Sequence, residues 1–590
     1  MADPTTKKLI NSVDACVDQS LEGLVASQPG LRLLQGHRVV IREDIEEVKK
    51  MGKVTILSGG GSGHEPAHAG FVGQGMLSGA VAGSVFTSPP PNSILAAIRA
   101  VGKNNPAGTL LIVKNYTGDR LNFGLAAERA TAEGLRVGMV VIGDDCALTS
   151  NDKTAGRRGL CGTILIHKIA GAMAEEGQSL EEIVKTVQSA VQSTGTIGVC
   201  LYPCSLPGAG HSFHLGHQDF ELGLGIHGEA GVQRMQLCSA DEVVKTMLDH
   251  MTSPTNQSRL PLETGDNIAL VINNLGGTSY LELGIVARAA LKYLATKGVS
   301  VKRAFCGTFM TSLEMAGVSV TIMHLDLDGI LTKCLDQDTT APAWPRVSLS
   351  GSSGLELNQA PPLPVDSDTT VTPAEGTEPE VSEAEFGALK AALHAACDSL
   401  AASEDSLNEL DRGSGDGDCG TTIKNGVQGI VSWLSELSQP ISPSSIALKL
   451  SSIAETHMGG SSGALYSLFF TAAATVLQSN TTPSGWVNAL KCGMDTVSKY
   501  GGAEVGDRTM LDSLHAAFTV LQGAKGDTID QGTIKQAAEA SRAAAEATAA
   551  MDAKAGRASY VSKDRLTRPD PGAMAVAIWM TAVASALQPK

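Results

Sequence analysis

At about 150 residues per domain, a chain of 590 residues is long enough for about four compact units. Glycine contributes 65 residues and aromatic residues only 4% of the chain, which predicts many glycine turns and alanine-rich helices. Acidic residues (61) outnumber basic residues (45), and no run of Lys and Arg stands out. The composition therefore argues against a nucleic-acid partner.

The cysteines and the N-terminal segment indicate a reducing compartment, which we interpret as the cytosol. The 11 cysteines include no CxxC pair, which argues against a disulfide framework and a zinc site. The first 20 residues carry charges but no apolar stretch, so no secretory signal is expected. Residues 69–98 have no charged side chain, but their five glycines and Pro89, Pro90 and Pro91 make a poor membrane span. We expect a buried α/β segment there and no membrane partner.

The N-terminal part alternates short apolar runs with helix-length stretches. Such runs occupy residues 54–58, 109–113, 139–143 and 268–273. Because they are apolar at successive positions, they predict strands covered on both faces, as in mostly parallel sheets. Ligands of such sheets bind beyond the carboxyl ends of the strands, where two polar motifs follow.

The C-terminal part has a helical period and is separated by a linker. Residues 337–380 are rich in Pro, Ser, Thr and acid, which predicts an interdomain linker. Beyond it, apolar residues recur at three and four positions, and no convincing strand is found. About eight helices are expected, at residues 386–400, 421–437, 444–457, 463–478, 484–500, 511–523, 533–553 and 571–588. The last is opened by Asp570 as N-cap and Pro571 in the first turn.

The two motifs after strands could contact a small polar ligand. Ser58-Gly-Gly-Gly-Ser-Gly-His64 exposes backbone N–H groups beside an imidazole. A tight strand-to-helix turn is the alternative interpretation, and the segment does not match a Walker A loop. Lys114-Asn-Tyr-Thr-Gly-Asp119 offers a cation, a hydroxyl and a carboxylate, with helix capping by Asp119 as the alternative. Their occurrence at two strand ends favours a site.

A third motif surrounds His227 with small residues. Gly223, Gly225 and Gly228 satisfy GxGxxG, but the preceding stretch is too polar for the strand of a dinucleotide fingerprint. An uncrowded imidazole could instead attack a carbonyl carbon, although an isolated histidine is more often structural.

Three carboxylates in eight residues, Asp411, Asp416 and Asp418, predict a metal site. Three carboxylates so close in sequence repel one another, and a bound divalent cation would neutralise their charge. Oxygen ligands favour a hard ion such as Mg²⁺. The spacing fails the EF-hand template, and an acidic turn is the alternative.

Three further glycine-rich segments stand at expected helix starts: 458–463, 506–512 and 569–572. Free N–H groups at helix starts attract phosphate, and Arg508 adds a fixed positive charge. Together with the three aspartates, these segments predict a magnesium-nucleotide site built from helix ends.

The motifs resemble those of the ATP-dependent dihydroxyacetone kinase family. GGGSGHEPAHAG, KNYTGDRLNFG, GLGIHGEAG, DGDCGTT, MGGSSGALY, GDRTMLDSL and GRASY followed by PDPG occur in the family's order, across both halves of the chain and without a departure at a motif position. The resemblance implies a K domain at 1–336, made of two α/β subdomains divided near residue 190. It also implies an L domain at 381–590, an eight-helix antiparallel barrel.

The resemblance also assigns residues to roles. His227 would bind the substrate carbonyl as a hemiaminal, with His64 and Asp119 as acid/base candidates. The implied substrate contacts are Gly61, Ser62, Gly63, His64, Lys114 and Asp119. The implied nucleotide contacts are Asp418, Cys419, Gly420, Thr421, Ser461, Ser462, Gly501, Arg508, Thr509, Asp570, Pro571 and Gly572. Asp411, Asp416 and Asp418 would hold Mg²⁺.

The activity implied is phosphorylation of dihydroxyacetone and D-glyceraldehyde with ATP. Animal members of the family also split FAD into AMP and riboflavin cyclic 4′,5′-phosphate, the FMN cyclase reaction, for which Mn²⁺ or Co²⁺ could replace Mg²⁺. A homodimer is also implied. A noncatalytic ligand sensor on the same fold remains the alternative, because fold alone does not establish catalysis.

Overall fold

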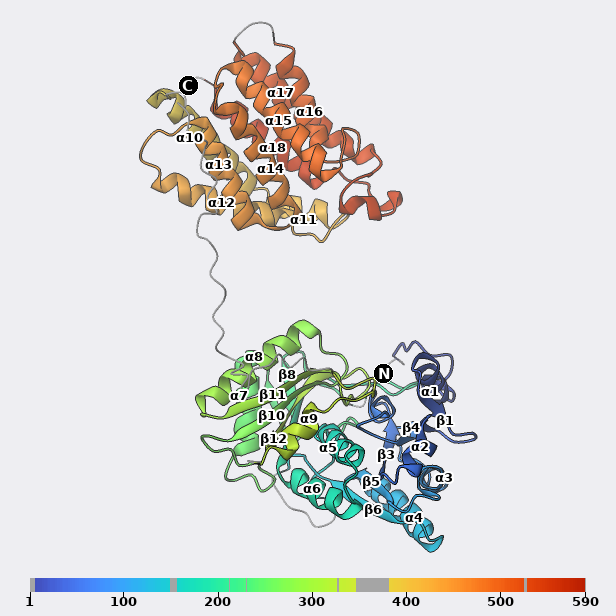
Figure 1. Cartoon of the computed structure of the whole chain (residues 1–590). Helices are drawn as coiled ribbons and strands as arrows, with labels where there is room; N and C mark the ends of the chain where they lie inside the picture. The colour runs from blue at the N-terminus through green and yellow to red at the C-terminus, as the bar shows by residue number, and fades with distance from the viewer. Residues whose placement is uncertain are drawn as a thin grey trace. The chain divides into compact units, whose positions relative to one another are not determined.

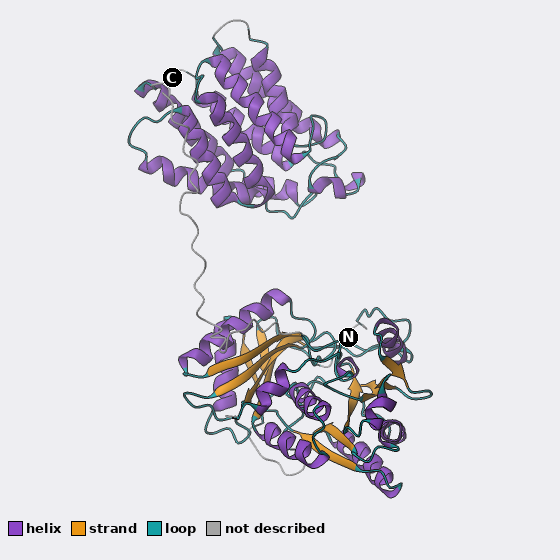
Figure 2. Cartoon of the chain, in the orientation of Figure 1, coloured by secondary structure: helices purple, strands orange, loops and turns teal. Residues whose placement is uncertain are grey.

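The computed structural model describes residues 6–148, 156–211, 213–229, 231–325, 328–345, 381–524 and 528–588. The chain divides into two compact units near residue 362 (Figure 1). The first is mixed α/β and the second is helical (Figure 2). This is the fold class expected from the two hydrophobic periods.

The first half of the N-terminal unit is a six-stranded sheet. Its strand order is β1 (Leu31–Leu33), β2 (Val39–Arg42), β4 (Gly79–Val85), β3 (Thr55–Ser62), β5 (Thr109–Lys114) and β6 (Val137–Ile142). The four strands from β4 to β6 run parallel, whereas β1 and β2 are antiparallel to their neighbours. The helices of this half are α1 (Cys16–Ser27), α2 (Ile45–Lys50), α3 (Pro91–Gly102), α4 (Thr117–Ala132), α5 (Thr163–Glu175) and α6 (Leu180–Gln192). The uncharged segment 69–98 forms a 3₁₀ turn, β4 and the start of α3, as a buried α/β segment should.

A second six-stranded sheet follows α6 directly. Its order is β11 (Ser300–Gly307), β10 (Asn267–Asn274), β12 (Ala316–His324), β7 (Thr194–Tyr202), β8 (Asp219–Leu222) and β9 (Gln233–Gln236). Only β10 and β11 pair in parallel, so the expectation of mostly parallel strands is wrong for this sheet. The apolar run in β10 indicates that both faces of the strand are buried. This burial occurs in parallel and antiparallel strands, so the run does not predict the strand direction. The helices here are α7 (Ala240–Thr252), α8 (Tyr280–Thr296) and α9 (Ile330–Asp336).

The N-terminal unit extends beyond residue 336 into the expected linker. Thr340 and Gln74 exchange hydrogen bonds, and Ala343 N–H donates to the Gly70 carbonyl at 3.0 Å. Trp344 is buried against Phe305, with ring centroids 5.0 Å apart. Residues 337–345 therefore belong to the N-terminal unit, because a few apolar side chains in a polar segment suffice to anchor it. The rest of the expected linker, 346–380, lies outside the described residues.

The C-terminal unit is a closed ring of helices. Its α-helices are α10 (Glu383–Ala401), α11 (Glu404–Asp411), α12 (Cys419–Glu436), α13 (Pro443–Ile453), α14 (Gly460–Leu477), α15 (Pro483–Gly501), α16 (Met510–Gln522), α17 (Gln531–Ala547) and α18 (Pro571–Ala586). All eight expected segments are helical, and the short α11 is an additional helix. From α12 onward each helix packs against the next, and α18 returns to α10, which closes the barrel. Short connections make neighbours from α12 to α17 antiparallel, so every second helix starts at the same end. The connection from α17 to α18 is longer, but Asp570 N–H donates to the Thr548 hydroxyl, so α18 starts where α17 ends.

The barrel encloses an apolar cavity of about 700 Å³. Its wall includes α14, the one helix among the described residues that is long and apolar enough to cross a membrane. α14 packs between α13 and α15, and its Tyr466, Phe469, Phe470, Ala473 and Leu477 line the cavity. All 11 cysteines are described, and none forms a disulfide.

Candidate functional site

The first two sequence motifs meet at one edge of the first sheet. β3 and β5 are adjacent and parallel, so the loop Gly61–His64 and the side chain of Lys114 lie at the same carboxyl edge. Asp119 follows in the first turn of α4 and is 3% exposed. The sheet topology therefore places the expected substrate contacts together.

Two glycines of this loop leave no room for a side chain. A Cβ at Gly61 would lie 2.6 Å from the backbone nitrogen of Thr87. Gly63 has φ +98°, and its carbonyl accepts a hydrogen bond from Leu313 N–H at 2.7 Å. The loop thus joins the two halves of the N-terminal unit, and its glycines are needed for that close approach.

His64 is fully buried and neutral. Its Nδ1 lies 2.8 Å from the Thr311 carbonyl oxygen, which only accepts, so Nδ1 carries the proton and Nε2 is left as an acceptor. Burial lowers the pKa of His64 well below its ordinary value, and the charges of Lys114 and His227 lower it further. Nε2 has no hydrogen-bond partner among the described residues and is available to a ligand hydroxyl.

Lys114 is a buried cation without a hydrogen-bond partner at Nζ in the described part of the chain. Burial lowers its pKa, and the carboxylates of Asp119 and Glu229 act in the opposite direction. Asp119 accepts a hydrogen bond from Ser88, and Lys114 Nζ stands 5.6 Å from the centroid of the Tyr116 ring. An uncompensated buried donor of this kind is suited to a ligand oxygen.

His227 joins these groups from the loop after β8. Its ring centroid is 4.8 Å from that of His64, 4.5 Å from that of Tyr116 and 5.4 Å from that of Phe86. The third motif therefore meets the first two, although His227 lies 113 residues after Lys114 in the sequence. Tyr116 lies within the second motif but was assigned no role, and Phe86 was not expected to contribute.

Glu229 is a further residue of the site to which the sequence analysis assigned no role. Its two carboxylate oxygens lie 3.2 Å from His227 Nδ1 and 3.1 Å from the backbone nitrogen of His227. A carboxylate two residues after a candidate nucleophilic histidine was the available signal.

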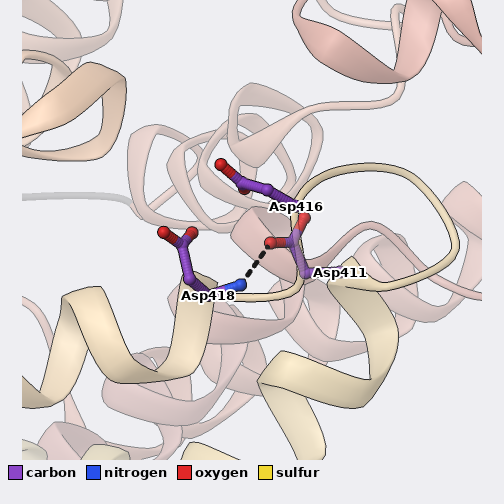
Figure 3. A group of neighbouring side chains, drawn as sticks. All are labelled: Asp411, Asp416 and Asp418. Carbon is purple, nitrogen blue, oxygen red and sulfur yellow. Dashed lines mark hydrogen bonds between the residues drawn. The ribbon is translucent and has the colours of Figure 1, made fainter. Parts of the chain in front are cut away.

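The three aspartates of the helical unit converge (Figure 3). One oxygen from each of Asp411, Asp416 and Asp418 lies within 4.8 Å of the other two. Asp411 ends α11, and its Oδ2 accepts backbone N–H groups of Gly417, Asp418 and Cys419 at 3.0, 3.1 and 3.2 Å. Burial and the charge of Asp416 raise the pKa of Asp418. Oxygen donors with mutual repulsion fit Mg²⁺.

The expected nucleotide contacts stand at helix starts of this unit. Cys419, Gly420 and Thr421 open α12, Ser461 and Ser462 open α14, Thr509 caps α16, and Asp570, Pro571 and Gly572 open α18. These are alternate helices of the ring, so their starts share one end. Both donors of Thr421 already have partners within the protein: its backbone N–H donates to Asn408 and its hydroxyl donates to Glu404. Gly501 ends α15, before the loop that leads to Arg508.

Arg508 links two of these helix starts. It is 2% exposed with φ +65°, and its Nη2 donates to the Arg568 carbonyl at 2.8 Å. Nη1 lies 3.9 Å from Asp570 Oδ2, and neither Nε nor Nη1 has a hydrogen-bond partner among the described residues. Guanidinium donors without a hydrogen bond beside helix N-termini are suited to phosphate.

Comparison with known proteins identifies the family of this chain. A Dak1 domain model matches residues 22–343, and a DAK2 domain model matches residues 414–585. The chain belongs to the dihydroxyacetone kinase family. Members of this family match over its whole length: the human Triokinase/FMN cyclase is 52% identical, covering 99% of this chain and 100% of that protein.

Two solved structures of this family are informative. The dihydroxyacetone kinase of C. freundii in complex with AMP-PNP and Mg²⁺ is 34% identical with a TM-score of 0.67, covering 98% of this chain and 100% of that one. The dihydroxyacetone kinase operon co-activator DhaQ is also 34% identical, with a TM-score of 0.51, but covers 55% of this chain and 97% of its own. The family thus includes a kinase and a co-activator of similar fold.

Proposed function

We propose that this chain phosphorylates dihydroxyacetone and D-glyceraldehyde with ATP, and that it also cleaves FAD as an FMN cyclase. The observation that carries the kinase proposal is the convergence of His227, His64 and Lys114 at one sheet edge. The full-length similarity to Triokinase/FMN cyclase supports both activities.

In the proposed kinase reaction, His227 Nε2 binds the carbonyl carbon of the substrate as a hemiaminal. Glycerol has hydroxyls but no carbonyl, so it gains no such anchor, and short carbonyl sugars are preferred. His64 Nε2 accepts a hydrogen bond from a substrate hydroxyl, and Lys114 donates to a substrate oxygen. Asp119 takes the proton of the hydroxyl that becomes phosphorylated, and the tether holds that hydroxyl in a fixed orientation.

The helical unit supplies the nucleotide site. Asp411, Asp416 and Asp418 would hold Mg²⁺, which neutralises phosphate charge when bound. Ser461, Ser462 and the start of α18 bind the nucleotide phosphates through helix N–H groups. Arg508 offsets the charge of the transferred phosphoryl group through Nε and Nη1, which make no hydrogen bond in the described part of the chain.

FAD cleavage requires a ribityl hydroxyl to attack phosphorus, and no carbonyl anchor. It therefore depends on the metal site of the helical unit and not on His227. Mn²⁺ or Co²⁺ can serve this reaction, since carboxylate ligands also suit those ions. We further propose a cytosolic homodimer.

Alanine substitution of His227 separates the two reactions. His227→Ala should abolish ADP release with dihydroxyacetone and retain FAD cleavage, and Asp416→Ala should impair both. Parallel loss of both reactions in a folded His227→Ala protein would contradict the separation.

A ligand sensor without catalysis is the second candidate. The similarity to the DhaQ co-activator favours a sensor. However, that protein matches only about half of this chain, which argues against the sensor. A coupled ADP-release assay with dihydroxyacetone decides between them, because a sensor produces no ADP.

A further inference from the structure

One carboxylate holds both the ring and the backbone of His227. Glu229 Oε1 lies 3.2 Å from Nδ1, and Oε2 accepts the backbone N–H of the same residue at 3.1 Å. An ionised carboxylate only accepts, so the neutral form of the imidazole carries its proton on Nδ1 and keeps the lone pair on Nε2. We propose that Glu229 is a positioning residue that selects this form of His227 and stabilises the charge its ring acquires on binding a carbonyl. This inference rests on the proposed kinase function.

The rings around His227 cannot select the reactive nitrogen by themselves. His64, Phe86 and Tyr116 meet its ring edge to face, with interplanar angles of 76°, 86° and 86°. These contacts fix the plane of the imidazole, but a 180° flip about Cβ–Cγ leaves its shape almost unchanged. The hydrogen bond to Glu229 distinguishes the two orientations, because only one of them brings a nitrogen to the carboxylate.

The surroundings keep Glu229 ionised and in place. Burial raises the pKa of Glu229, but the hydrogen bond from His227, the His227 ring when it is protonated and the Arg158 guanidinium lower it, to about 2. Arg158 is itself anchored, because Nε donates to Asp145 Oδ2 at 2.6 Å and Nη2 donates to the Gly223 carbonyl at 2.7 Å. The carboxylate is therefore available as an acceptor throughout the neutral pH range.

Gly225 leaves the space that this carboxylate occupies. A Cβ at this position would lie 1.9 Å from Glu229 Oε2 and 2.8 Å from Arg158 Nη1. The second glycine of the GxGxxG pattern thus has a geometric reason unrelated to dinucleotide binding. It permits the carboxylate to reach His227.

The bond changes balance without a further reactant. The Nε2 lone pair forms a bond to the carbonyl carbon, and the π pair of the C=O bond moves to oxygen. The ring becomes cationic with its proton on Nδ1, facing Glu229, and the alkoxide oxygen takes up a proton from water. Release of the Nδ1 proton to water returns the ring to neutrality, so one proton is gained from solvent and one is returned to it. A negative charge beside Nδ1 stabilises the cationic stage, as the aspartate does in serine protease triads.

The first test compares two Glu→Gln variants of the same loop. Glu229→Gln removes the charge and lets an amide NH₂ face Nδ1. Glu221→Gln is the matched control, because Glu221 is a buried glutamate of the same segment that accepts Gly231 N–H at 3.0 Å and pairs with Arg234 instead of His227. We expect Glu229→Gln to lower kcat/KM for dihydroxyacetone by at least about 10-fold, with about 10⁴-fold as the upper bound, and Glu221→Gln to lower it less. Equal losses in the two variants, or a loss under about twofold in Glu229→Gln, would overturn the proposal.

A second variant tests positioning by chemical rescue. The Glu229 side chain is 42% exposed, so Glu229→Gly opens a space that formate can enter from solvent. We expect added formate to restore kinase turnover in this variant and chloride at equal ionic strength not to do so. Failure of formate to restore turnover in a variant that folds, measured by its unchanged melting temperature, would contradict the role of the carboxylate.

His227→Ala keeps this inference distinguishable from the proposed function. If His227→Ala retains kinase turnover, the covalent anchor is wrong and the role of Glu229 falls with it. If His227→Ala is inactive while Glu229→Gln is fully active, the anchor stands and only the positioning role is wrong. Crystals soaked with dihydroxyacetone give the direct readout, since hemiaminal occupancy on His227 should fall in Glu229→Gln.

Discussion

Replacing Asp570 by Asn should stabilise the helical unit at neutral pH. Asp570 caps α18, and its Oδ1 accepts Ala573 N–H at 2.8 Å. Burial raises the pKa of Asp570 to about 6, although the Ala573 N–H and the Arg508 guanidinium act in the opposite direction. Asn keeps the capping oxygen but carries no charge, so the substitution removes the cost of burying the carboxylate.

The size of the effect follows from the pKa. The folded-state pKa of about 6 is about two units above the ordinary 3.8, and each unit corresponds to about 1.4 kcal/mol. The folded unit therefore loses on the order of 3 kcal/mol when Asp570 ionises. Because the folded-state pKa is raised, the contribution of protonated Asp570 to the free energy of unfolding is fully present below about pH 4. It is lost as the pH rises through about 6. For a unit of about 200 residues this corresponds to about 6–12 °C in melting temperature.

Differential scanning calorimetry of the full chain measures this effect, with the helical transition identified by its shift on adding AMP-PNP and Mg²⁺. Asp570→Asn should raise that transition at neutral pH and leave it nearly unchanged at pH 4. Asp530→Asn is the matched control, because Asp530 is an exposed N-cap of α17 whose pKa is lowered by the Thr533 N–H. A fall in melting temperature at neutral pH for Asp570→Asn, as for the control, would refute the reasoning.

Three further outcomes follow from the structure. Asp416→Ala should abolish the rise in the helical melting temperature on adding Mg²⁺, because it removes one of three converging carboxylates; a retained rise would place the ion elsewhere. Gly61→Ala should reduce kcat/KM for dihydroxyacetone more than it reduces the melting temperature, because its Cβ would displace the loop at Thr87; an unchanged kcat/KM would separate this loop from substrate binding. Leu514→Ala, at a fully buried position of α16, should cost the helical unit about 2–5 kcal/mol in chemical denaturation, and a loss below about 1 kcal/mol would mean that this core collapses to fill the space.

The glycine loop and the three aspartates were visible in the sequence because their chemistry is local. Asp411, Asp416 and Asp418 fall within eight residues, so a short turn suffices to bring their oxygens together. The cap of α18 was also readable, since Asp570 and Pro571 satisfy backbone requirements that any helix start imposes.

The start of the linker and the strand directions in the second sheet could not be predicted from local sequence. Composition marked residues 337–345 as linker, but Trp344 and Ala343 dock on the N-terminal unit through partners that are distant in sequence. The apolar run of β10 indicated a buried strand, but its antiparallel pairing with β12 depends on how the chain returns to the sheet.

The sequence by itself determined the two hydrophobic periods, the helix caps and the short polar motifs, because each depends on residues within one or two turns of chain. Only the tertiary structure decided that His227 stands against His64, Tyr116 and Phe86, and that Glu229 holds its ring. The contacts between the rings join loops from two sheets. Their geometry depends on strand order and register, which local sequence patterns do not specify.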